Sequence, residues 1–230
     1  MGVQGWWVIQ RDDEFRFSLD AVLLAHFATV RSDSQSVDLG TGTGAVALFL
    51  LSRGVSTVSG IEVNPRLAGM AGRTAALNEL AGRMKIVCGD VNQVKSWFSA
   101  GQFDLVTANP PYRLPDTGRI SPREGVALAR HETTAGLPEF LRAGVFLLRN
   151  RGRLAMIHLP ERLPELCAEM HNAGVEPKRL RFVHPFHDRA AKMVLMEGVK
   201  GARAGLTVMP PLVVYQAPGV YQPEILSYYR

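Results

Sequence analysis

The chain has 230 residues, of which 47% are hydrophobic, and its formal net charge is +5 at pH 7. No apolar stretch approaches the length of a membrane span and the first residues do not read as a signal peptide, so we expect a cytoplasmic protein. Cys88 and Cys167 lie far apart in apolar contexts, which favours free thiols over a disulfide or a metal centre. No Gly/Ser-rich or Pro-rich linker divides the chain, so we expect a single domain.

The first predicted element is a helix over Asp20–Val30, which follows Ser18. An acid in the first turn interacts favourably with the helix dipole, so helix capping is the simplest role for Asp20.

A glycine-rich loop follows the first predicted strand. Residues 36–39 read as a short buried strand, then come Gly40-Thr41-Gly42-Thr43-Gly44 and a helix over Gly44–Ser52. The glycines allow a tight turn and let a ligand approach the helix N-terminus. Glu62 ends the next strand, twenty residues beyond Gly42, where an acid can bind ribose hydroxyls. An adenosine-bearing cofactor is therefore expected, although Gly40-x-Gly42-x-x-Ala45 also satisfies the fingerprint of dinucleotide-binding proteins.

Two more strand ends carry polar residues. Asp90 follows the strand predicted at 84–87, and Asn109 follows the one at 103–108. A lone Asp or Asn is more often a cap or a loop residue. Ligands of open α/β sheets, however, bind outside the carboxyl ends of the strands. Together with Asp38 and Glu62, these residues are predicted to form the rim of one binding site at the carboxyl ends of the strands.

The tetrapeptide Asn109-Pro110-Pro111-Tyr112 indicates a pocket for a planar nitrogen. The NH2 group of a nucleobase or a carboxamide is a poor nucleophile because its lone pair is delocalised. The side-chain oxygen of Asn109 and the carbonyl of Pro110 can each accept one of its hydrogens, and the prolines hold the backbone extended. Tyr112 can stack on the substrate ring, a contact worth roughly 1–3 kcal/mol for a base.

These motifs, from Val37 to Tyr112, resemble the class I S-adenosylmethionine-dependent methyltransferases, and Asn-Pro-Pro-Tyr is the signature of those that act on amino groups. The resemblance implies that Glu62 binds the ribose, Asp90 the adenine amine and the glycine loop the methionine end of the cofactor. The cofactor residues expected are Asp38, Gly40, Thr41, Gly42, Gly44, Glu62, Asp90, Val91 and Asn109. The catalytic residues expected are Asn109, Pro110 and Tyr112, with no metal.

A closer resemblance is to the bacterial enzymes that methylate the N6 amine of an adenosine beside the anticodon of valine tRNA. It extends to residues 15–25, 191–201 and 210–212. The resemblance implies a Rossmann-like α/β fold: a seven-stranded, mostly parallel sheet, helices on both faces, and a C-terminal hairpin whose last strand is antiparallel to the rest. Residues 1–35 would be a cap segment before a catalytic core over 36–230. Asp20 would then lie over the cofactor.

The remaining elements follow the same order. Further helices are predicted at residues 66–80, 138–148 and 163–173, and further strands at 153–158, 178–184 and 192–197. The segment 114–130 is rich in Pro, Gly and Arg and is expected to be a loop that closes over the substrate. The six histidines show no metal-ligand spacing and read as scattered surface or core residues.

The positive charge is concentrated in the second half of the chain. Lys and Arg number 3 against 5 Asp and Glu in residues 1–35, 6 against 5 in residues 36–112, and 17 against 11 in residues 113–230. The basic clusters are Arg113, Arg119, Arg123 and Arg130, then Arg149, Arg151 and Arg153, then Lys178, Arg179 and Arg181. A basic surface beside an amine pocket suits a nucleic acid, although solvated arginines are a common alternative.

We therefore expect an N-methyltransferase that uses S-adenosylmethionine and acts on adenine N6 in tRNA. Three alternatives use the same motifs: a release-factor glutamine methyltransferase, an amino-methyltransferase for guanine in rRNA or adenine in DNA, and a non-catalytic module that binds the cofactor or RNA. Release-factor enzymes usually carry an extra helical N-terminal domain, which argues against the first. The sequence leaves the modified position and the oligomeric state open.

Overall fold

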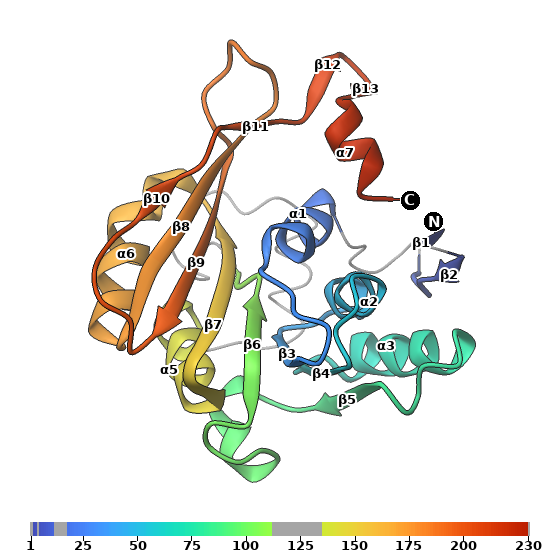
Figure 1. Cartoon of the computed structure of the whole chain (residues 1–230). Coiled ribbons are helices and arrows are strands. Elements are labelled where there is room, and N and C mark those ends of the chain that lie inside the picture. The colour runs from blue at the N-terminus through green and yellow to red at the C-terminus, as the bar shows by residue number, and fades with distance from the viewer. Residues whose placement is uncertain (1, 4, 12–17, 112–134, 230) are drawn as a thin grey trace.

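The computed structural model of the chain describes residues 2–3, 5–11, 18–111 and 135–229. A twisted central sheet runs through it (Figure 1). Its main path is β10-β8-β9-β7-β6-β3-β4-β5, and β11 also pairs with β8. The strands are β3 (Gln35–Leu39), β4 (Thr57–Glu62), β5 (Met84–Cys88), β6 (Phe103–Ala108), β7 (Leu148–His158), β8 (Val175–His184), β9 (Met193–Lys200), β10 (Thr207–Val208) and β11 (Leu212–Val213).

The sheet has nine strands where the sequence predicts seven. Seven of them are the expected ones; β3 to β7 are parallel to one another, and β9 is antiparallel to both of its neighbours, β7 and β8. The other two are β10 and β11, each of two residues, which pair with β8. Segments this short show no hydrophobic periodicity, so the sequence gives no sign of them.

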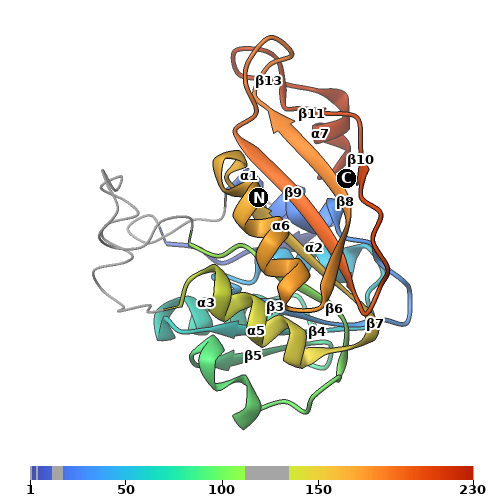
Figure 2. The same cartoon turned by 90° about the vertical axis from the view of Figure 1, so that its left-hand side faces the viewer.

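Helices cover both faces of the sheet (Figures 1 and 2). The apolar cores of the two faces use alternate residues of the same strands: Leu105, Ala155 and Leu195 on one, Val106, Leu154 and Met196 on the other. On the first face lie α1 (Leu19–Phe27), α2 (Ala45–Ser52) and α3 (Pro65–Leu77); on the second lie α5 (Leu137–Leu147), α6 (Leu163–Asn172) and the 3-10 helix η1 (Val91–Ser96).

Helix α1 ends at Phe27, three residues before the predicted Val30. The Arg53 guanidinium donates hydrogen bonds to the carbonyls of Ala25 and Ala28. The next residue, Thr29, is held by Glu197 on β9, with 2.7 Å from its amide to Glu197 Oε2 and 2.8 Å from its hydroxyl to Oε1. These tertiary contacts satisfy the last carbonyls of the helix and turn the chain away, which local propensity does not show.

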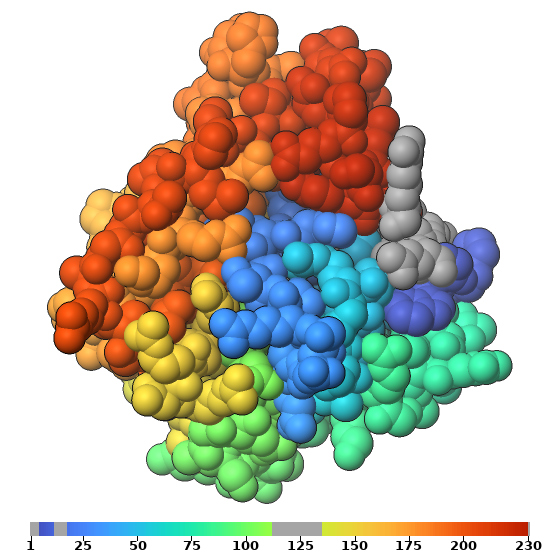
Figure 3. Space-filling model, in the orientation of Figure 1, coloured from blue at the N-terminus to red at the C-terminus, as the bar shows by residue number. Residues whose placement is uncertain are grey.

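The C-terminal segment packs on α1. The ring of His26 stacks on that of Tyr228 with centroids 4.2 Å apart, and Ile225 is fully buried. Figure 3 shows this red segment resting against the blue α1. The short elements are β1 (Gly2–Val3), β2 (Trp6–Trp7), η2 (Pro160–Arg162), β12 (Tyr215–Ala217), β13 (Val220–Tyr221) and α7 (Pro223–Ser227). Within the described ranges, no helix combines the length and apolarity needed to cross a membrane.

Candidate cofactor and amine site

The strand register brings the predicted rim together. Leu39 at the end of β3 pairs with Ile61 on β4 and with Ala108 at the end of β6, while Glu62 pairs with Cys88 at the end of β5. Asn109 directly follows Ala108, so it lies level with Gly40 on the adjoining strand, and neighbouring strands are about 4.8 Å apart. The glycine loop and the Asn-Pro corner therefore share one edge of the sheet.

The glycine loop needs glycine at different positions for different reasons. Gly40, Gly42 and Gly44 have φ angles of 70°, 57° and 84°, in the left-handed region that favours glycine. A Cβ on Gly44 would lie 2.4 Å from Met84 Cε, so this position also serves packing. A Cβ on Gly42 would meet nothing within 4 Å. Gly42 thus presents bare backbone to open space, where a ligand can approach.

Glu62 holds the glycine loop in place through a hydrogen bond. It is 7% exposed, its Oε2 accepts a hydrogen bond from the Gly42 amide at 2.8 Å, and its Oε1 accepts one from the Asn64 amide at 2.9 Å. Asn64 in turn caps α3. A carboxylate oxygen has more than one acceptor site, so Glu62 can hold the loop and still accept ribose hydroxyls.

Asp38 is buried beneath the loop and is 1% exposed. Its Oδ1 accepts a hydrogen bond from the Thr107 hydroxyl at 2.7 Å. Burial raises the pKa of Asp38 from 3.8 to about 7, and the negative charge of Glu62 adds to the rise, while the hydroxyls of Thr107 and Thr41 lower the pKa in part.

Three buried oxygens at this place, Asp38 Oδ2, Thr41 Oγ1 and Thr43 Oγ1, make no hydrogen bond of normal geometry with the described residues, although the Thr41 hydroxyl is near enough to Asp38 to lower its pKa. Buried polar atoms are normally satisfied, so these oxygens call for a ligand or for water. A carboxylate and two hydroxyls beside an open glycine suit the charged methionine end of a nucleoside cofactor. The residues present therefore fit the cofactor that the sequence predicts.

Asp90 and Val91 begin η1. Asp90 is half-buried, and its Oδ1 accepts a hydrogen bond from the Asn92 amide at 2.9 Å. The Val91 side chain is 6% exposed and belongs to the core, so only its backbone remains for a ligand. Gly89 packs against Trp97, where a Cβ would lie 2.1 Å from the ring. Because its side chain accepts the Asn92 amide hydrogen, Asp90 also acts as the N-cap of η1, the common role of such a residue.

The described part of the amine corner is Asn109 and Pro110. Asn109 is half-buried and Pro110 is buried. Within the described ranges, neither the Asn109 amide nor the Pro110 carbonyl has a hydrogen-bond partner. No described residue therefore competes with an amine for these two acceptors. Tyr112, the expected loop 114–130 and the cluster from Arg113 to Arg130 lie outside the described residues.

His158 is a neighbour that sequence reasoning missed. It is fully buried at the end of β7, two residues beyond Met156, which pairs with Ala108. This register places His158 level with Pro110. Burial lowers its pKa to about 4, with a further contribution from the positive charge of Arg162, so the ring is neutral at physiological pH. Its place after the apolar run 154–157 is the signal that could have found it.

Asp20 lies in the first turn of α1, half-buried, as expected of an acid at a helix start.

Comparisons with known proteins agree with this geometry. A family model described as a methyltransferase domain matches residues 37–119, from β3 past the Asn-Pro corner. A tRNA1(Val) (adenine(37)-N6)-methyltransferase from Porphyromonas gingivalis is 31% identical over 224 residues, which cover 91% of this chain and 85% of the relative. The protein of that name from Parabacteroides distasonis is 29% identical and covers 77% and 74%.

Solved structures share the fold. A predicted O-methyltransferase from Agrobacterium tumefaciens has a TM-score of 0.70 at 23% identity, covering 91% of this chain and 95% of that one. TrmN from Thermus thermophilus has a TM-score of 0.54 at 22% identity, covering 78% and 48%. At these identities the likeness concerns the fold alone.

The matches cover both the cofactor loop and the regions outside it, and the first relative aligns over nearly the whole chain. The protein is therefore a methyltransferase whose cofactor is S-adenosylmethionine. The chain belongs to the family of tRNA1(Val) (adenine(37)-N6)-methyltransferases.

Proposed function

We propose that this protein methylates the exocyclic N6 amine of an adenosine in tRNA and that Asn109 and Pro110 hold this amine. One observation carries the proposal: the Asn-Pro corner lies level with the glycine loop on adjoining strands, with two acceptors that have no other described partner. The tRNA substrate is supported by the printed name of relatives that align with most of the chain.

The cofactor residues follow from the edge of the sheet. Asp38 would hold the ammonium of the methionine end, with backbone from Gly40, Thr41, Gly42 and Gly44 around it. Glu62 would accept the ribose hydroxyls. Asp90 would accept the adenine amine, and the backbone of Val91 would lie beside the base. The buried unsatisfied oxygens of Asp38 and Thr41 support the first of these roles.

S-adenosylmethionine, when bound, supplies an electrophilic methyl group on a sulfonium. The protein's part is alignment. The Asn109 side-chain oxygen and the Pro110 carbonyl accept the two amine hydrogens and so direct the nitrogen lone pair away from themselves, and Tyr112 stacks on the base. Neither acceptor needs to be a strong base, since the nitrogen releases its extra proton to solvent only after the new N–C bond has formed and S-adenosylhomocysteine has become the leaving group. Positioning of this kind can account for several kcal/mol of barrier.

A direct test uses labelled S-adenosylmethionine and separate pools of tRNA, rRNA, DNA and release factor. We expect label in tRNA, and digestion to nucleosides should yield N6-methyladenosine. Label in a glutamine, in guanine or in DNA would replace the proposed substrate by one of the alternatives. No label in any pool, with cofactor binding intact, would point to a non-catalytic module.

A further inference from the structure

A basic hollow lies away from the amine corner. Its volume is about 960 Å³. Of the twelve described residues that line it, seven are Arg or Lys and none is Asp or Glu. They come from four segments far apart in sequence: the turn after α1, the start of β7, the start of β8, and the loop after β9. The fold thus gathers two of the basic clusters noted in the sequence, those around Arg151 and Lys178.

The hollow lies near the amino ends of the parallel strands, whereas the cofactor site lies at their carboxyl ends. Arg153, at its floor, pairs with Leu105 near the start of β6, whereas Asn109 comes four residues later. At about 3.3 Å per residue, the two sites are separated by roughly 13 Å along the strands. Figures 1 and 2 both show the loop between β9 and β10 beside the start of β7, far from the end of β6.

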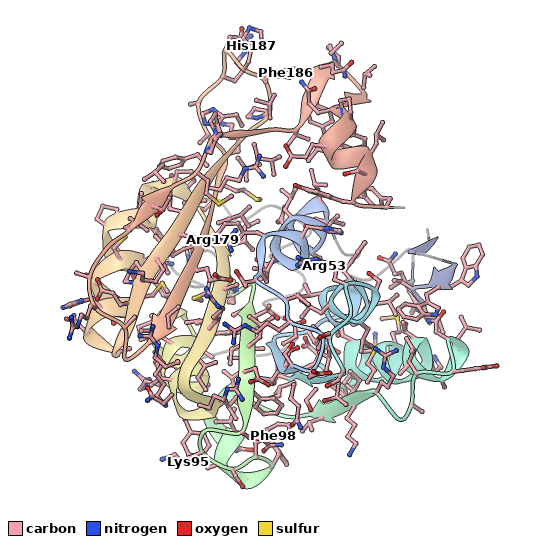
Figure 4. The ribbon with its side chains drawn as sticks, in the orientation of Figure 1. Arg53, Lys95, Phe98, Arg179, Phe186 and His187 are labelled. Atoms are coloured by element: carbon pink, nitrogen blue, oxygen red, sulfur yellow. The ribbon has the colours of Figure 1, made fainter. Side chains whose placement is uncertain are left out.

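Some of the charges in the hollow are already neutralised. Glu197 on β9 is fully buried beneath it and accepts hydrogen bonds from Arg153 at 2.7 Å and from Arg179 at 3.2 Å. Figure 4 shows Arg179 between β8 and the turn after α1. Arg149 forms an ion pair with Asp104.

The other four cations, Arg31, Arg151, Lys178 and Arg203, form no ion pair with any described carboxylate. Like charges grouped around one concave surface repel one another, and a bound polyanion relieves this repulsion.

The backbone of the hollow is strained at one of these cations. Arg151 has φ of 63°, a left-handed conformation that is unfavourable for any residue with a Cβ. Phe103 pairs with Leu148, and Leu105 pairs with Arg153. Four residues of β7, Arg151 among them, therefore lie opposite a single residue of β6, and β7 bulges by three residues at this point. Glycine, which has no Cβ, would adopt this conformation without a steric penalty. An exposed arginine in such a conformation indicates a role for its side chain.

We propose that the basic hollow binds the phosphate backbone of the RNA substrate as a second contact, remote from the target base; this inference rests on the proposed function. Three features favour a nucleic-acid backbone over a single small anion. The hollow is far larger than one phosphate, its charges are spread over four segments, and arginine donates paired hydrogen bonds that match phosphate oxygens.

The test measures tRNA binding over a series of KCl concentrations with Arg151→Gly and Arg151→Gly/Arg203→Ala. Each lost phosphate contact is expected to reduce the magnitude of the salt slope by about 1, and the double variant should bind tRNA about tenfold or more weakly near physiological salt. In the methylation assay, KM for tRNA should rise while kcat and S-adenosylhomocysteine affinity stay unchanged. Arg151→Gly removes the backbone strain, so its Tm should equal or exceed that of the wild type.

Arg73→Ala, an exposed arginine on α3 far from the hollow, is the matched control and should leave the salt slope unchanged. An unchanged slope and KM in the double variant would overturn the inference while leaving the methylation of tRNA intact. If the wild type bound tRNA but methylated only another substrate, the proposed function would be wrong. The salt slopes of the variants would still show whether the hollow contacts RNA. Weaker RNA binding accompanied by a lower Tm would show a folding defect and contradict a specific contact.

Discussion

At the scale of single residues, Asp38 links cofactor binding to pH. Burial raises its pKa to about 7 in the protein without ligand, whereas in the unfolded chain it is 3.8. Between these values the folded protein holds a proton that the unfolded chain has lost, so stability falls as the pH rises from about 4 to about 7. A cation bound next to the carboxylate would reverse this preference, because an opposite charge favours the ionised form.

We therefore predict that S-adenosylhomocysteine, which carries the ammonium, binds more tightly as the pH rises through about 7 and that its affinity levels off above this value. Calorimetric titrations at several pH values would measure this, together with proton release on binding. Asp38→Asn keeps the shape and removes the titration, so its weaker affinity should vary little with pH. A wild-type affinity that is flat across this range would argue against Asp38 as the ammonium partner.

Gly42 offers a second residue-scale prediction. Gly42→Ala should cost about 1–2 kcal/mol of stability because its φ of 57° is unfavourable for alanine, and it should also weaken S-adenosylhomocysteine binding, since the methyl group would project into the ligand's space.

Gly54→Ala is the matched control for Gly42→Ala. Gly54 also has a positive φ, of 95°, and open space around its Cβ, but it lies after α2, away from the cofactor edge. We expect a comparable loss of stability with unchanged affinity. Equal affinities for the two variants would mean that Gly42 does not face the cofactor.

At the scale of elements, Glu197 on β9 joins the turn after α1 to β7 and β8. Its carboxylate, with no exposed area, accepts hydrogen bonds from Thr29, Arg153 and Arg179. Removing one member of a buried charge network leaves the others without compensation.

Glu197→Ala should lower the free energy of unfolding by about 3–5 kcal/mol, measured by urea denaturation. The exposed Glu161→Ala should change it by less than about 0.5 kcal/mol. If the two variants unfolded at similar urea concentrations, Glu197 would not be the tie between these elements.

Element boundaries show where local signals suffice. Helix α2 is predicted at 44–52 and spans 45–52; strand β6 is predicted at 103–108 and has those bounds. These segments are largely apolar, and each has a glycine or proline within two residues of both ends. The predicted end of α1 is wrong because Arg53 and Glu197, distant in sequence, terminate the helix.

At the scale of the whole molecule, the motifs alone predict which edge of the sheet carries the candidate site. Four strand ends carry Asp38, Glu62, Asp90 and Asn109, and parallel strands bring such ends to one edge. Two features needed the structure. The apolar run 154–157 marks His158 as a strand end, but only the β6–β7 register places it beside the corner, and the basic hollow forms only when four separate segments meet. Both depend on packing between segments distant in sequence, which the residue pattern within one segment does not predict.

The roles of the individual site residues stay predictions, as does the division into a cap segment and a catalytic core. The expected single domain is likewise still a prediction. The cofactor and amine roles can be tested separately at most positions, since Asn109 alone is expected in both sets and the other cofactor residues lie on or after different strands.

The most direct measurement of the central claim is the rate of methyl transfer in a single turnover, with Asn109→Ala compared with the wild type at saturating cofactor and tRNA. Asn172→Ala, an exposed asparagine at the end of α6, is the control. If Asn109 aligns the amine, the rate should fall at least about 100-fold while cofactor affinity stays within a few-fold, because a misplaced nucleophile loses its attack geometry. An unchanged rate for Asn109→Ala would contradict the account.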